Sequence, residues 1–229
     1  MFENILNWKL LKGSHDFPGP DGGTCINEAA IVAAGFKYHA IHCAEDCPPC
    51  FSRVISGYAI GLNDTMPDYM RNHLLMRFVT RLAGTTDTPA KEMQRAERIV
   101  LSTINRILSI YFSYFEIPSA ANHCRHASNI NNAMDALRII TFGKPMLILS
   151  CILEAARLLD HNDPINAVYS ASHVAMIAAD EVRDGDVIIW VETAHILDEA
   201  ILMGRHETIE EDVAVDRLTK AKTSAAEAV

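Results

Sequence analysis

The sequence lacks long uninterrupted hydrophobic runs, an excess of basic residues and a recognisable export signal. Its longest apolar helical stretches carry charged residues, so no segment is predicted to span a membrane. Its 20 basic and 29 acidic residues give a formal net charge of −9. This balance argues against a general nucleic-acid binder, because such a protein needs a basic face to contact phosphates. The first 13 residues contain an early acid and only a broken apolar run, so we expect a cytoplasmic protein.

Regular alternation of strands and helices is also missing, and so is any repeat of fixed period. Apolar residues nevertheless make up 49% of the 229 residues, which is ample for a hydrophobic core. They recur at helical spacing through most of the chain. The pattern predicts a mostly α-helical protein, built as a helical array with a loop-rich N-terminal module.

The polar, proline-terminated segment 85–89 is the best internal boundary. We therefore expect a Cys/His-containing module at residues 1–85 and a helical region at residues 86–229, packed in the same compact unit. Residues 91–117 are predicted to form one long helix with apolar positions on more than one face near its end. Such a helix should be covered on several sides. The β-branched run 187–191 is the one place where a short strand competes with helix.

Residues 13–56 concentrate the features that suggest a site. This stretch holds four of the six cysteines, three of the ten histidines and many turn-forming residues. Without export, the cysteines are expected to be reduced thiols or metal ligands rather than disulfides.

Zinc binding is one interpretation of this stretch. Cys47 and Cys50 form a C-x2-C pair, and tetrahedral zinc needs four such ligands. With His15 and Cys25 within loop reach, the predicted ligand set is His15, Cys25, Cys47 and Cys50. The alternative is a set of free thiols on a surface loop. Together with Cys43, the pair also matches the C-x3-C-x2-C spacing of radical-enzyme clusters, but the missing strand–helix alternation argues against that chemistry.

Cys25 can also be interpreted as a nucleophile. It follows Thr24, the expected N-cap of a helix, and a helix N-terminus lowers a thiol pKa. His15 or His42 would then be the base, and Glu28 would orient it. The alternative is that Cys25 is a small buried residue that packs the helix start. Glu28 is also expected to pair with an arginine of a later helix, Arg81.

Several short motifs resemble a recurring pattern in a family of bacterial and phage proteins that has no assigned activity. The motifs are Gly13-Ser14-His15, then Gly23-x-Cys25-x-x-Glu28-Ala29, then Cys50-x-Ser52-x-Val54-Ile55, and further on Leu62-Asn63-Asp64 and Arg81-Leu82-x-Gly84-Thr85. The similarity implies no function. It does mark His15, Cys25, Glu28 and Cys50 as the residues to examine.

Two function classes remain open. We favour a non-catalytic helical protein that acts through a protein partner or as a homo-oligomer, with its N-terminal loop pinned by a structural zinc or by hydrogen bonds. The alternative is a cysteine-dependent or metal-dependent hydrolase that uses Cys25 with His15 and Glu28. Zinc is the one candidate cofactor, and neither membrane binding nor general nucleic-acid binding is expected.

Overall fold

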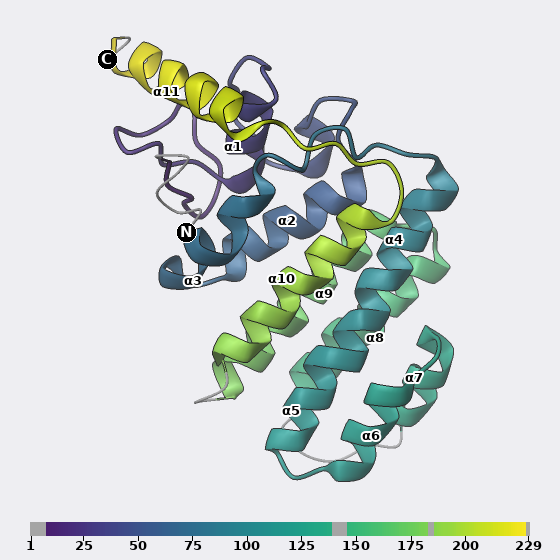
Figure 1. The fold of residues 1–229 in the computed structure, drawn as a ribbon. Helices are drawn as coiled ribbons and strands as arrows, with labels where there is room; N and C mark the ends of the chain where they lie inside the picture. Colours follow the sequence, from purple (N-terminus) through teal and green to yellow (C-terminus); the bar gives the residue numbers. More distant parts are fainter. Residues whose placement is uncertain (1–7, 139–145, 183–185, 228–229) are drawn as a thin grey trace. The chain divides into compact units, whose positions relative to one another are not determined.

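The computed structural model describes residues 8–138, 146–182 and 186–227, and these residues are mostly helical (Figure 1). The expected mostly α-helical array is therefore confirmed. Over these ranges no β-strand forms, and the one β-type pairing is an isolated bridge between Leu10 and Thr24. Residues 187–191 lie inside a helix, so the competing strand does not form. None of the described helices combines the length and apolar character needed to cross a membrane.

Contacts divide the chain into two compact units. Among the described residues, the N-terminal unit comprises 8–88 and 201–227, and the central unit comprises 89–138, 146–182 and 186–200. The predicted boundary at residue 85 lies close to this division. The C-terminal residues, however, belong with the first unit rather than with the helical region 86–229 in which we placed them. The physical reason is the packing of the last helix, α11, on the first helix, α1.

The N-terminal unit is built around α1 (Ile26–Ala33), whose eight residues are all buried. Small side chains such as Ala29 and Ala30 allow close approach of its neighbours, and Gly35 ends the helix with a φ of +89° that favours glycine. The other helices of this unit are α2 (Arg53–Thr65), α3 (Asp68–Leu75) and α11 (Glu211–Glu227), with 3₁₀ turns at Ala44–Asp46 and Met76–Phe78.

The central unit contains the predicted long helix. It runs as α4 (Pro89–Ser102), a π-helical turn (Thr103–Leu108) and α5 (Ser109–Tyr114). Its side chains at Ile99, Ile104, Ile107 and Phe112 are fully buried, as a helix covered on several sides requires. The remaining helices are α6 (Pro118–His126), α7 (Ile130–Arg138), α8 (Met146–Asp160), α9 (Pro164–Glu181) and most of α10 (Asp186–Leu202).

Candidate functional site

The carboxylate of Glu28 is the centre of the predicted site. It lies in the first turn of α1, is fully buried and accepts five hydrogen bonds. One oxygen, Oε1, accepts from the Ser14 hydroxyl at 3.0 Å, the His15 amide at 2.8 Å and the Ile41 amide at 3.1 Å. The other, Oε2, accepts from the Cys25 amide at 2.8 Å and from His15 Nδ1 at 3.1 Å. One buried carboxylate therefore joins two loop segments, at residues 14–15 and at residue 41, to the start of a helix.

Cys25 serves as the N-cap of α1. Its sulfur accepts a hydrogen bond from the Glu28 amide at 3.4 Å, while the Glu28 side chain accepts from the Cys25 amide. This reciprocal arrangement is a capping box with cysteine in the place usually held by serine or threonine. The expected cap, Thr24, instead accepts a hydrogen bond from the Trp8 indole at 2.9 Å. The cap is therefore one residue later than predicted.

The environment of the Cys25 thiol disfavours its thiolate. The residue is 3% exposed. Burial raises the pKa of the thiol well above its usual value, and the negative charge of Glu28 raises it further. A helix N-terminus was expected to lower this pKa, but desolvation and the adjacent carboxylate outweigh the helix dipole. The thiol is therefore protonated at neutral pH and shielded from solvent.

His15 is held firmly and remains partly accessible. Its Nδ1 is bonded to Glu28, its carbonyl oxygen accepts from the Tyr38 hydroxyl at 2.8 Å, and its side chain is 24% exposed. Burial raises the pKa of Tyr38, which keeps its hydroxyl a donor. Within the described residues, His15 Nε2 has no hydrogen-bond partner. Arg81, which we expected to pair with Glu28, is not among its partners and lies over the Phe78 ring, 5.6 Å from its centroid.

The four predicted zinc ligands do not form one group. His15 and Cys25 meet at Glu28, whereas Cys47 and Cys50 belong to a different loop contact. The Cys47 carbonyl accepts from the Arg53 guanidinium at 2.5 Å, and the Cys50 carbonyl accepts from the Thr86 amide at 3.0 Å. In the described part of the chain, no group of three or more His, Cys, Asp or Glu residues could hold a metal ion. Hydrogen bonds hold these loops in the present structure.

Two polar residues of α2 hold the N-terminal segment. Asn63 is fully buried; its Oδ1 accepts from the Ile26 amide at 3.2 Å and its Nδ2 donates to the Leu11 carbonyl at 2.8 Å. The Asp64 carboxylate accepts from the Gly13 amide at 2.9 Å. Both residues belong to the recurring motif Leu62-Asn63-Asp64, but no role for them was predicted from the sequence. A polar Asn-Asp pair within an otherwise apolar helix was the available signal.

Hydrogen bonds also join the two later motifs, at residues 50–55 and 81–85. The Ser52 amide donates to the Thr85 hydroxyl at 3.0 Å, and the Thr85 hydroxyl donates to the Leu82 carbonyl at 2.6 Å. Together with the contact between Thr86 and Cys50, these bonds fasten the start of α2 to residues 82–86. Motifs that are far apart in the sequence therefore have the same structural role, because their hydrogen bonds fix the loops of the N-terminal unit.

A surface hollow of about 520 Å³ lies beside this cluster, and we call it the basic hollow. Asp16 and Tyr38 both line it. Asp16 follows His15 in the chain and the Tyr38 hydroxyl donates to the His15 carbonyl, so the hollow is next to His15. Its wall on one side is a face of α11. Its main lining residues are Phe17, Phe36, Tyr38, Lys37, Arg217 and Lys220. Basic and aromatic side chains are therefore gathered next to the pinned loops.

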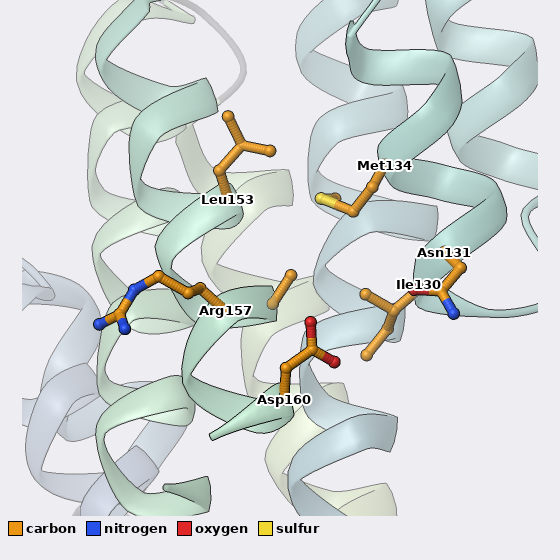
Figure 2. Close-up of a pocket in the computed structure, with 7 residues that line it drawn as sticks. Ile130, Asn131, Met134, Leu153, Arg157 and Asp160 are labelled. Atoms are coloured by element: carbon orange, nitrogen blue, oxygen red, sulfur yellow. The ribbon is translucent and has the colours of Figure 1, made fainter. Parts of the chain in front are cut away.

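A second hollow, of about 460 Å³, lies in the central unit between α7 and α8 (Figure 2). Ile130 and Met134 extend from α7 toward α8, and the Asp160 carboxylate lies at one end (Figure 2). Arg157 points away from these side chains, and its guanidinium is paired with Glu154 through bonds of 2.6 and 2.7 Å. The hollow is thus of mixed character, since apolar side chains line it together with Asn131, Arg157 and Asp160.

No protein-family model, no curated protein and no solved structure matches this chain. The inference of function therefore depends on the residues themselves. The similarity of the motifs to bacterial and phage proteins stays a prediction.

Proposed function

We propose that the protein is a non-catalytic binding protein, which acts through a protein partner that contacts the loop surface of its N-terminal unit. The observation that supports this proposal is the saturation of Glu28, whose two oxygens accept five hydrogen bonds from loop residues and a helix cap. A carboxylate that acts as acid, base or nucleophile must reach a substrate. This one is buried and engaged on both oxygens, so its role is to order the loops.

Ordered loops suit a binding surface, because a surface that is rigid before binding loses less conformational entropy when a partner docks. The loops carry two large exposed aromatic side chains, Phe17 at 56% and Phe36 at 42% exposure. Aromatic residues are enriched in protein interfaces, where they supply apolar area at low entropic cost. The loops that the buried Glu28 cluster orders are thus the same loops that present the exposed aromatic side chains.

Site-specific photo-crosslinking tests the proposal. A photoreactive phenylalanine analogue is placed at Phe17 in the full chain, and the cells that naturally produce the protein are irradiated. The matched control carries the analogue at Tyr69, which is 64% exposed and lies on α3 of the same unit. We expect a discrete crosslinked species from position 17 that is absent from position 69. The same species at both positions, or none at position 17, would refute the proposal.

The geometry of His15 favours a second candidate, a hydrolase. Its Nδ1 is bonded to a buried carboxylate and its Nε2 is unpaired in the described structure, which is how an enzyme orients a histidine base. In this alternative Glu28 orients His15, while Cys25 keeps its capping role. Hydrolysis of ester, amide and phosphate-ester substrates that is abolished by His15→Gln, with unchanged folding, would favour the enzyme over the binding protein.

A further inference from the structure

The basic hollow has the form of a groove along α11. Its lining residues on that helix are spaced i, i+3, i+4, i+7 and i+8, so they share one helical face: Arg217, Lys220, Ala221, Ser224 and Ala225. Two turns of helix at about 1.5 Å per residue give a wall of roughly 12 Å. A wall of this length suits a peptide segment better than a compact small molecule.

The opposite wall includes an apolar surface whose aromatic side chain at Phe36 is held in place. Val32 and Pro18 are buried, while Phe17 and Phe36 are exposed at the hollow. The Phe36 ring packs edge-on against Phe51, with centroids 6.4 Å apart, which fixes its orientation. An apolar side chain of a partner would therefore find two aromatic surfaces already in position.

Arg217 is preorganised at the edge of the hollow. Its Nη1 donates to the Ala33 carbonyl at the end of α1 at 2.7 Å. Its guanidinium lies so close to Gly35 that a Cβ added there would be 3.1 Å from Cζ. The other N–H donors of Arg217 have no partner among the described residues, and a guanidinium fork matches a carboxylate.

The charge of the hollow is opposite to that of the whole chain. Lys37, Arg217 and Lys220 line it together with a single carboxylate, Asp16, whereas the chain has a formal net charge of −9. Lys220 also contacts Asp216 at 2.7 Å, but both side chains are largely exposed, so this pair is weak and open to competition. The hollow is therefore a local basic patch on an acidic protein.

From these features we infer that the basic hollow binds an acidic segment of a partner protein that also carries an aromatic or aliphatic side chain. A partner carboxylate pairs with Arg217 and Lys37, and the apolar side chain rests between Phe17 and Phe36. Nucleic acid fits less well, because it presents phosphates in a continuous row and the hollow offers three cations beside Asp16. The inference rests on the proposed function and names the chemistry of its partner.

Fluorescence anisotropy with the full-length protein tests the inference. The probe is a fluorescein-labelled peptide of repeated Glu-Glu-Leu-Phe units, and the matched peptides carry Gln or Lys in place of Glu. We expect the acidic peptide to bind and the other two to bind at least about tenfold more weakly. Lys37→Glu should weaken binding of the acidic peptide about tenfold, while Lys12→Glu, an exposed lysine outside the hollow, should change it less than about twofold.

Arg217→Met is a second variant, with circular dichroism to confirm folding because it also removes the bond to Ala33. Equal binding of the Gln peptide, unchanged binding by Lys37→Glu, or no binding of the acidic peptide would overturn the inference. A dimer in solution that Lys37→Glu dissociates would also overturn it, in favour of a second copy of this chain. A partner crosslinked at Phe17 despite these failures would preserve the proposed function, so the two ideas fail separately.

Discussion

Replacing Glu28 by glutamine tests the contact on which the loop structure depends. The side chain keeps its shape, but one carboxylate oxygen becomes an amide donor. If the NH₂ takes the place of Oε2, it faces the Cys25 amide; if it takes the place of Oε1, it faces the amides of His15 and Ile41. In either orientation at least one buried backbone N–H is left without an acceptor.

The expected destabilisation follows from these contacts. A buried donor left unsatisfied costs about 1–3 kcal/mol, and each remaining bond weakens because its acceptor is no longer charged. Relief from burying a charge offsets part of this loss, so we expect a net loss of about 3 kcal/mol. In a unit of roughly one hundred residues, that corresponds to a fall in Tm of about 12 °C or more.

Two measurements check this value. Thermal unfolding followed by circular dichroism gives the Tm. Hydrogen exchange should show faster exchange at Cys25 and Ile41, whose amides are bonded to Glu28, and unchanged exchange in α4 of the central unit. The control, Glu45→Gln, alters an exposed carboxylate of the same loop region and should leave Tm within about 2 °C. A Glu28→Gln variant as stable as this control would refute the reasoning.

Three further predictions concern buried groups. Burial raises the pKa of Cys47 from 9.0 to about 11, so the folded state retains a proton that the unfolded state releases above pH 9. The free energy of unfolding should keep the full contribution of this thiol below pH 9 and fall by about 2–3 kcal/mol as the pH rises to about 11. Urea titrations should show a smaller fall over the same pH range for Cys47→Ala. Ile107→Asp places a carboxylate at a fully buried position, so near-ultraviolet circular dichroism should show loss of fixed packing; a cooperatively unfolding variant would contradict the burial. Among the thiols, exposed Cys43 should alkylate before buried Cys25 in native protein; faster reaction of Cys25 by mass spectrometry would instead support the nucleophile hypothesis.

Helical content was predictable because its signals are local. Apolar side chains at a spacing of three and four residues predicted the helix that runs from Pro89 to Tyr114, and Gly35 marked the end of α1. The π-helical turn inside the long helix was not predicted. There the Thr103 hydroxyl donates to the Ile99 carbonyl at 2.9 Å, and such side-chain bonds compete with the helix backbone in ways that periodicity does not report.

The sequence also identified part of the candidate site by itself. Cys25 and Glu28 are three residues apart at a helix start, and this spacing alone permits the capping box that the structure contains. The nucleophile interpretation expected Glu28 to contact either His15 or His42, and the structure contains the contact with His15; its chemical role stays a prediction. The predicted pairing of Glu28 with Arg81 was wrong, because loop N–H groups that must be satisfied on burial occupy both carboxylate oxygens.

Only the tertiary structure decided which distant segments meet. Arg217 contacts Ala33 across 184 positions, which brings the C-terminal helix to the N-terminal unit and completes the basic hollow. Asn63 bonds to Leu11 and Ile26, which are also distant in the sequence. A buried polar side chain needs hydrogen-bond partners, and the packing of the apolar helix faces determines which groups lie close enough to supply them. Hydrophobic periodicity and helix caps are local signals, which involve residues only a few positions apart in the sequence. These long-range contacts instead depend on how all the helices of a unit bury their apolar faces together.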